Sequence, residues 1–251
     1  MKILITGGSS GIGKDIAKIL AKKENELVIV ARDENKLNET KKELEEMGAK
    51  VVSIVADLSK EENCIEIHKK VQNVDILINN AGFGDCGNFT KTNLDKEIKM
   101  INTNIVAYHV LTKLYLTDMK KRNSGKILNV ASIAGFMPGP LMATYYATKA
   151  YIVRLSEAIR EELIKEKSKV QISILCPGPV ATNFNKVANV KFKIREANSM
   201  EVAKYAIKKL KKGKFYIVPG IDVKFAKIGA KIFPTKLVGK VAYMVQKRKL
   251  I

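Results

Sequence analysis

Three residue types that can move a proton occur at a spacing that would bring them together. Tyr145 and Lys149 are four residues apart, and Ser132 precedes the tyrosine by thirteen positions. Side chains at i and i+4 of a helix share one face, and an ammonium favours the phenolate form of a nearby tyrosine. A hydroxyl can hydrogen-bond an oxygen on which charge develops. The set suits proton transfer at a carbonyl or alcohol oxygen; the alternative is a buried tyrosine, a surface lysine and a strand-end serine.

The chain opens with a glycine-rich turn, Thr6-Gly7-Gly8-Ser9-Ser10-Gly11-Ile12-Gly13. Glycine allows a tight turn and a close approach to a pyrophosphate, and a helix that begins near Ile12 offers N–H groups and a positive dipole to phosphates. The G-x-x-x-G-x-G spacing differs from the more general G-x-G-x-x-G, and an ordinary glycine-rich turn is the alternative. The turn predicts a dinucleotide held by Gly7, Ser9, Ser10, Gly11, Ile12 and Gly13.

Short continuous apolar runs alternate with helical patterns along the chain. Strands that are apolar throughout are typical of burial on both faces, and strands separated by helices indicate a parallel sheet. The predicted fold class is α/β, a three-layer doubly wound Rossmann fold with a parallel, seven-stranded sheet. Strands are expected at 2–6, 27–31, 51–56, 76–79, 126–132, 171–175 and 215–218. Helices are expected at 14–22, 34–47, 64–71, 94–120 and 143–166.

The length of 251 residues and a hydrophobic content of 46% predict one domain, 1–251, with a substantial core. Residues from about 183 to 200 are the least regular and are expected to form a loop with short helices. The segment 221–251 is expected to hold two basic amphipathic helices, 223–232 and 235–249, broken at Pro234.

These motifs together resemble the short-chain dehydrogenase/reductase family. The glycine turn, Asn79-Asn80-Ala81-Gly82, Ser132, Tyr145-x-x-x-Lys149 and Pro177-Gly178-Pro179-Val180-Ala181-Thr182 follow the family order from Lys2 to Thr182. The resemblance implies that Tyr145 is the general acid/base, that Ser132 polarises the carbonyl, and that Lys149 also binds the nicotinamide ribose.

The family has a fourth catalytic member, an asparagine on the long helix before the fifth strand. Asn102 and Asn104 both qualify by position, and Asn104 is preferred because a small residue, Ala107, follows it three positions on. The resemblance implies that Asn104 holds a water that links Lys149 to solvent.

The choice of dinucleotide depends on the end of the second strand, Val30-Ala31-Arg32-Asp33. An acidic residue there would accept from a ribose 2′-hydroxyl. Ala31 occupies that position, and Arg32 can bind a 2′-phosphate. NADP(H) is therefore favoured; NAD(H) is the alternative, with Arg32 on the surface and Asp33 at the ribose. The resemblance implies further cofactor contacts from Asp57, Leu58, Asn80, Ala81, Gly82, Tyr145, Lys149, Pro177, Gly178, Val180 and Thr182.

The net charge is +20, and residues 185–251 hold 18 lysines and arginines against three acids. A solvated basic surface is the preferred interpretation, and no nucleic-acid partner is expected because no such motif accompanies the charge. A weak contact between segment 221–251 and an anionic membrane surface is a hypothesis from charge and amphipathicity.

The compartment is expected to be the cytoplasm. No run of 18 uninterrupted apolar residues occurs, the first residues run straight into a strand, and the three cysteines lack C-x-x-C spacing. No metal site is expected, since His68 and His109 lack local ligand partners.

The sequence thus predicts an NADP(H)-dependent oxidoreductase that moves a hydride between nicotinamide and a carbonyl or secondary alcohol. Aromatic and apolar residues near the expected site favour a hydrophobic substrate such as a ketone, a steroid-like compound or a 3-oxoacyl compound. The family resemblance implies a homodimer or homotetramer through helices 94–120 and 143–166. The alternative is a non-catalytic dinucleotide-binding redox sensor or membrane-surface binding protein. The residues considered for the substrate wall are Phe83, Phe89, Phe136, Met137, Leu141, Met142, Phe184 and Phe192.

Overall fold

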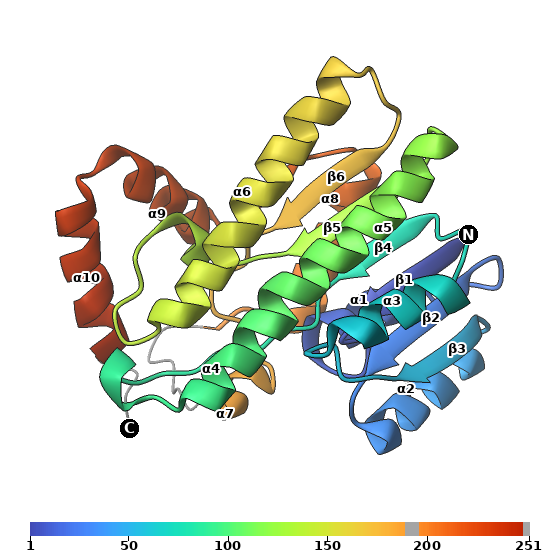
Figure 1. The fold of residues 1–251 in the computed structure, drawn as a ribbon, viewed down its shortest axis with the longest axis horizontal. Helices are drawn as coiled ribbons and strands as arrows, with labels where there is room; N and C mark the ends of the chain where they lie inside the picture. Colours follow the sequence, from blue (N-terminus) through green and yellow to red (C-terminus); the bar gives the residue numbers. More distant parts are fainter. Residues whose placement is uncertain (189–195, 248–251) are drawn as a thin grey trace.

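The computed structural model describes residues 1–188 and 196–247. A seven-stranded sheet of order β3-β2-β1-β4-β5-β6-β7 runs through the molecule, and every neighbouring pair is parallel (Figure 1). The predicted fold class is confirmed. The strands are β1 Lys2–Thr6, β2 Glu26–Ala31, β3 Lys50–Val55, β4 Ile76–Asn79, β5 Lys126–Val130, β6 Gln171–Leu175 and β7 Tyr216–Ile217.

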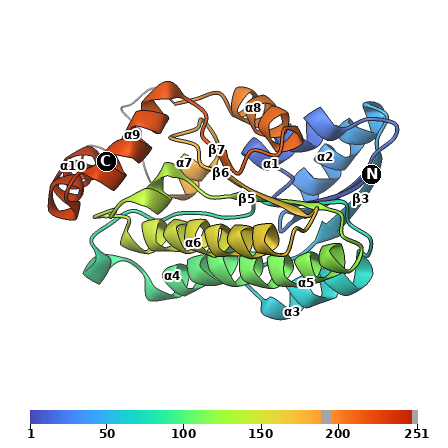
Figure 2. The same cartoon turned by 90° about the horizontal axis from the view of Figure 1, so that it is seen from above.

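Helices cover both faces of the sheet, as Figure 2 shows from above. On one face lie α1 Gly11–Leu20, α2 Glu34–Glu46 and α8 Ser199–Lys211. On the other lie α3 Glu61–Lys70, α4 Leu94–Ile101, α5 Ala107–Lys121 and α6 Ala143–Lys165. Successive strand residues enter opposite layers: in β1, Ile3 and Ile5 join one core cluster and Leu4 joins the other. Burial on both faces explains why the inner strands are mostly apolar, whereas the edge strand β3 is largely exposed.

The strand order reverses between β1 and β4. From β1 the chain builds β2 and β3 on one side, and β4 then pairs on the other side of β1. Connections diverge at such a switch point and leave a crevice at the carboxyl ends of the strands, where ligands bind in this architecture.

The long helix predicted over 94–120 is continuous but not uniform. A π-helical turn, Asn102–Val106, joins α4 to α5. A π turn widens the helix locally and often marks a functional position. It contains Asn104, which is fully buried.

Two further elements differ from expectation. α8 was not predicted, although Val202, Ala203, Ala206, Ile207 and Leu210 are buried at helical spacing and Asn198 caps the helix by accepting from the backbone N–H groups of Met200 and Glu201. The fifth strand ends at Val130, two residues early, because the chain turns into a 3-10 helix, Ile133–Phe136, where the Ile133 N–H bonds the Pro177 carbonyl.

The irregular region and the carboxyl-terminal segment follow the expected pattern where they are described. A short helix, α7 Phe184–Val187, lies within the first, and residues 189–195 fall outside the described part. α9 Ile221–Ile232 and α10 Thr235–Lys247 break at Pro234, and residues 248–249 of the predicted second helix are not described. Within 1–188 and 196–247, no helix is both long and apolar enough to cross a membrane.

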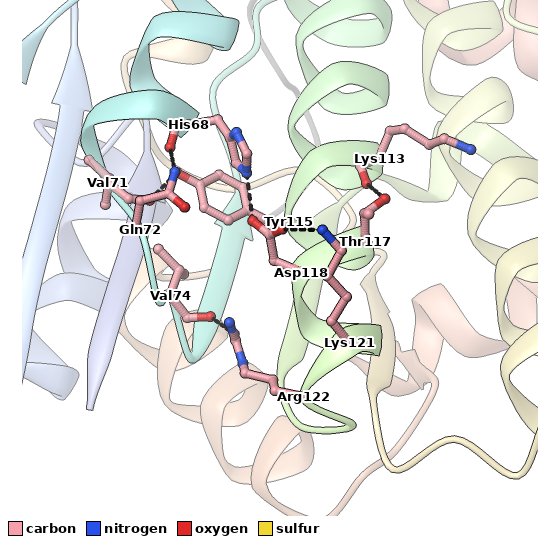
Figure 3. A network of polar contacts seen from close by, with 10 residues as sticks. All are labelled: His68, Val71, Gln72, Val74, Lys113, Tyr115, Thr117, Asp118, Lys121 and Arg122. Carbon is pink, nitrogen blue, oxygen red and sulfur yellow. Dashed lines mark hydrogen bonds and ion pairs between the residues drawn. The ribbon is translucent and has the colours of Figure 1, made fainter.

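A polar network connects the end of α5 to α3 and to the start of β4 (Figure 3). His68 Nε2 lies 2.7 Å from Asp118 Oδ2, and the Tyr115 hydroxyl donates to the Val71 carbonyl at 3.0 Å. Arg122 donates to the carbonyl of Val74 just before β4. His68 therefore has a structural partner, and α5 is held in register with the sheet.

A second network crosses the buried core between α5 and α6. Asn79 Nδ2 donates to Thr112 Oγ1 and to Asn129 Oδ1, both at 3.0 Å, and Asn129 Nδ2 donates to Ser156 Oγ at 3.0 Å. Asn129 is completely buried. These hydrogen bonds link both long helices, α5 and α6, to β4 and β5 directly below the crevice.

Asn129→Leu should lower the free energy of unfolding by about 1–3 kcal/mol, because it leaves buried polar partners on Asn79 and Ser156 unsatisfied. Urea denaturation measures the change, with exposed Asn35→Leu as the matched control, expected within about 0.5 kcal/mol of the parent. Equal midpoints for the two variants would show that the network contributes no stability.

Candidate active site

A cleft of about 680 Å³ opens at the carboxyl ends of the strands. Its walls contain every predicted cofactor and catalytic residue except Gly13 and Asn104. Residues from six strand ends and from α6 therefore meet at the switch point.

The glycine turn forms one end of the cleft. Gly7 and Gly11 adopt φ of +65° and +51°, which favours glycine, and the Gly7 N–H bonds the Val30 carbonyl at 2.8 Å. Gly13 does not line the cleft but packs against the turn. A Cβ at this position would lie 2.3 Å from both Asn80 Nδ2 and the Gly7 carbonyl oxygen. Among the described residues, Ser10 makes no side-chain cap to α1, so the first N–H groups of the helix remain available to an anion.

Thr6 and Asn80 brace this turn against the end of β4. Thr6 Oγ1 accepts from the N–H groups of Asn80 and Ala81 at 2.9 and 3.1 Å. Asn80 Nδ2 donates to the carbonyls of Thr6 and Gly7 at 3.0 and 3.1 Å. The Asn80 side chain thus shapes the turn, and residues 80–82 line the cleft.

At the end of β2, Arg32 lines the cleft and Asp33 caps the next helix, α2. Arg32 Cζ lies 6.0 Å from the centre of the Phe83 ring. Asp33 caps α2 by accepting from the Lys36 N–H at 3.1 Å, and it pairs with Lys36 Nζ at 2.6 Å. These contacts with Lys36 lower the pKa of Asp33.

Asp57 and Leu58 line the same end of the cleft, after β3. Burial raises the pKa of Asp57, but hydrogen bonds from Ser59 and the charge of Arg32 outweigh it and leave that pKa below its usual value. The carboxylate stays ionised.

Tyr145, in the first turn of α6, faces Ser132. Ser132 is itself held, because its Oγ accepts from the Ala134 N–H at 3.2 Å and donates to the Pro177 carbonyl at 3.4 Å. Burial raises the pKa of the Tyr145 phenol, and a hydrogen bond with Ser132 lowers it only partly. The expected lowering by Lys149 is therefore not seen in the protein alone: the phenol is protonated at neutral pH.

Lys149 turns its ammonium to the end of β5. Its Nζ donates to the Val130 carbonyl at 2.9 Å, and burial lowers its pKa to about 8. Tyr108 donates its hydroxyl to the same carbonyl at 3.1 Å, and its ring centre lies 5.4 Å from Lys149 Nζ. Tyr108 was missed by sequence reasoning, although its position one turn after Asn104 is a usable signal.

Asn104 lies behind the cleft and beside Lys149. Its Nδ2 donates to the Phe83 carbonyl at 2.9 Å and to Thr148 Oγ1 at 3.1 Å, and its Oδ1 accepts from the Phe83 N–H at 3.1 Å. A Cβ on Gly82 would lie 2.9 Å from Asn104 Oδ1 and 3.6 Å from Lys149 Nζ. Asn102 and Asn104 are both outside the cleft wall, but Asn104 hydrogen-bonds Phe83, which lines it. The position preferred from the sequence is thus the one that contacts the site.

The other end of the cleft is apolar. Met142 and Phe184 line it, together with Tyr146 and Val187, which sequence reasoning did not select, whereas Phe83 lines the cleft near Arg32. The Phe184 and Tyr145 ring centres are 5.2 Å apart. The remaining described aromatic candidates lie elsewhere: Phe89 is 67% exposed, and Phe136 packs near Tyr216. Met137 and Leu141 are not in the wall, and Phe192 is outside the described residues.

Comparison with known proteins decides the family. A family model described as short chain dehydrogenase matches residues 1–191. The chain belongs to the short-chain dehydrogenase family. Family membership, expected from the motifs, is thereby confirmed.

Three relatives illustrate the range of this similarity. The chain is 35% identical over 183 residues to the ketoacyl reductase HetN of Nostoc sp., covering 71% of this chain and 63% of that one. It is 34% identical over 197 residues to a very-long-chain 3-oxoacyl-CoA reductase of Anas platyrhynchos, covering 75% and 62%. A short-chain dehydrogenase from Sphingobium yanoikuyae, solved in complex with NADPH, matches with a TM-score of 0.84 and 26% identity over 92% of each chain. The chain thus matches less than two thirds of the first two relatives' length.

Lys149→Met should stabilise the fold at pH 7 by an amount on the order of 1–3 kcal/mol, because it removes a buried ammonium while Tyr108 still satisfies the Val130 carbonyl. The folded-state pKa of about 8 lies below the ordinary 10.5, so the penalty is full below pH 8 and vanishes as the pH rises towards 10.5. Urea midpoints at pH 7 and pH 10 measure this, with exposed Lys165→Met as the control. A gain that is the same at both pH values would contradict the assignment to charge burial.

Proposed function

We propose that this protein is an NADP(H)-dependent oxidoreductase that interconverts a carbonyl compound and a secondary alcohol. The main support is the meeting of Tyr145, Ser132 and Lys149 in the same cleft as the glycine turn. A bound nicotinamide dinucleotide would supply or accept the hydride. The protein's own residues then have to bind, orient and transfer a proton.

Tyr145 is the proposed general acid in the reducing direction. Its raised pKa keeps the phenol protonated at neutral pH, so a proton is available where a carbonyl oxygen gains charge. Ser132, fixed by Ala134 and Pro177, lies beside the phenol and can donate to the same oxygen. In the oxidising direction the same phenol oxygen must accept the proton, which requires a nearby positive charge to lower its pKa.

Lys149 is the proposed source of that charge and of a contact to the nicotinamide ribose. Its ammonium is 5.9 Å from the Tyr145 ring centre and only 4% of the residue is exposed. Asn104 is the proposed positioning residue for this corner, since its side chain fixes Phe83 and Thr148 on either side of Lys149. A water beside Asn104 and Lys149 remains part of the proposal.

NADP(H) is proposed over NAD(H) because of the end of β2. Arg32, Asp33 and Lys36 all line this end of the cleft; because Asp33 pairs with Lys36 and caps α2, Arg32 is the side chain proposed to bind a 2′-phosphate. A guanidinium binds phosphate well, and the two carboxylates beside it in the wall are already held, Asp33 by Lys36 and Asp57 by the Ser59 N–H.

The proposed substrate is hydrophobic, a ketone, a steroid-like compound or a 3-oxoacyl compound. Met142, Phe184 and Val187 give the end of the cleft beyond Tyr145 an apolar wall. Two relatives are named ketoacyl reductase and 3-oxoacyl-CoA reductase, which supports the same class.

We also propose that the protein forms a homodimer or homotetramer and is located in the cytoplasm. The outer face of α4–α6 exposes Leu94, Ile98 and Tyr151, apolar area that a second copy would cover. Cys64 and Cys176 are buried thiols with pKa values raised to about 12 by burial, which suits a reducing compartment.

Tyr145→Phe should lower kcat by about 100-fold or more, because it removes the only proposed proton donor, while NADPH affinity changes little. The rate of NADPH oxidation across ketones, aldehydes, steroids and 3-oxoacyl thioesters measures turnover, and fluorescence titration measures binding. Tyr146→Phe is the matched control and should stay within a few-fold of the parent. Tight NADPH binding by the parent without turnover of any substrate would instead favour a non-catalytic redox sensor.

Arg32→Ala should lower kcat/KM for NADPH by about tenfold to a hundredfold and leave NADH almost unaffected, because a charge-assisted contact to phosphate is lost. Steady-state kinetics with both cofactors give the ratio. Asp33→Asn tests the alternative: a selective loss of NADH use in that variant, with no change in Arg32→Ala, would contradict the NADP(H) proposal.

A further inference from the structure

The carboxyl-terminal hairpin, α9 and α10, turns apolar side chains outwards. Ile221, Phe225, Ile228 and Ile232 follow one another at intervals of four, three and four residues and are 72%, 70%, 52% and 71% exposed. In α10, Leu237, Val241 and Met244 repeat the pattern and are about half exposed. We call these seven residues the apolar stripe. Helices normally turn such a stripe to the core, so this one indicates a covering partner.

The opposite faces of the two helices explain why the stripe is outside. Val223 of α9 is buried in the core cluster near Val218 and Cys176. In α10, Ala242 and Gln246 are buried. The hairpin is thus anchored to the domain by its inner face, and the stripe cannot turn inwards without losing these contacts.

Lysines border the stripe in both helices, three positions after a stripe residue. They are exposed and lie on one side of it, whereas the inward-facing Lys227 stacks on the Tyr216 and Phe136 rings. Asp222 is the sole acid within 221–247. The bordering lysines are Lys224, Lys231, Lys240 and Lys247.

We propose that this hairpin docks on an anionic lipid surface, with the apolar stripe at the acyl boundary and the lysines among the headgroups. An amphipathic helix with a lysine border binds in this way. Helices of 12 and 13 residues extend about 20 Å, less than the hydrocarbon thickness of about 30 Å, so each lies along the surface. A second copy fits less well, because two such faces would bring like charges together.

The inner face of the hairpin lies next to the proposed substrate end of the cleft. A Cβ on Gly178, in the cleft wall, would lie 2.8 Å from Val223 Cγ2 of α9. Gln246 of α10 donates to the hydroxyl of Tyr146, which lines the apolar end. In Figures 1 and 2 the hairpin lies beside the amino-terminal end of α6, far from β3. Docking would place the apolar end of the cleft close to the membrane.

Vesicle flotation with the full chain tests the docking. Vesicles of phosphatidylcholine with phosphatidylglycerol should bind the protein, vesicles of phosphatidylcholine alone should bind it at least tenfold less, and salt should weaken the binding. Phe225→Ser with Ile228→Ser should lower the bound fraction at least tenfold, and Lys224→Gln with Lys231→Gln about tenfold.

Matched controls lie on distant exposed surfaces. Met47→Ser removes an apolar side chain that is 48% exposed, and Lys22→Gln with Lys23→Gln removes the same charge; both should bind vesicles like the parent. Absence of vesicle binding, or equal binding by all variants, would overturn the proposal. So would a parent oligomer, indifferent to vesicles, that dissociates in sedimentation velocity when the stripe is changed, because the stripe would then join two copies.

The docking does not depend on the proposed reaction, and one added measurement separates them. Each variant is assayed for NADPH-dependent turnover of a water-soluble carbonyl compound, which should be unchanged because the altered residues lie outside the cleft. If the parent binds vesicles but shows no turnover, only the proposed reaction is contradicted. If it shows turnover but does not bind vesicles, only the docking is contradicted.

Discussion

The Val130 carbonyl, at the end of β5, is the acceptor on which the site depends. It receives the Lys149 ammonium at 2.9 Å and the Tyr108 hydroxyl at 3.1 Å. A buried ammonium needs strong partners, and a backbone carbonyl at a strand end is a rigid one. Because Asn129, the residue before Val130, is tied to Asn79 and Ser156, the strand end cannot shift freely. The position of the ammonium is thus fixed by the sheet.

This arrangement places ionisable groups where the proposed reaction needs them and lowers the free energy of unfolding in return. Burial lowers the pKa of Lys149 to about 8 and raises that of Tyr145 above its usual value. Tyr145 therefore stays neutral and Lys149 stays mainly an ammonium at neutral pH, but burial disfavours the charged form of both, and a bound positive nicotinamide would favour the phenolate. Sites that hold groups in unfavourable charge states commonly reduce the stability of the fold. The Tyr108 ring, whose centre lies 5.4 Å from Lys149 Nζ, offsets part of that cost through a cation–π contact.

Sequence reasoning succeeded where the signal is local. Apolar runs fixed the strands because burial on both faces demands them, and the Tyr145–Lys149 spacing placed two side chains on one face of α6. It failed where a distant segment decides. Tyr108 matters only because β5 ends beside it, and Gly13 packs on Asn80 instead of lining the cleft. The π turn at Asn102–Val106 has no local sequence mark. α8 differs, since its helical spacing was present and was overlooked.

The hairpin shows how a variable segment can act on a fixed site. In the proposed reaction, the strand ends, the turns and α6 hold the groups for proton transfer and for the nucleotide. α9 and α10 add to this core through a few inward contacts, at Val223 and at the Gln246–Tyr146 pair. The same helices therefore contact two residues of the cleft wall, Gly178 and Tyr146, on one side and expose the stripe on the other. A hydrophobic carbonyl compound partitions into lipid, so an enzyme with its apolar cleft beside a docked face would meet that substrate where its concentration is highest.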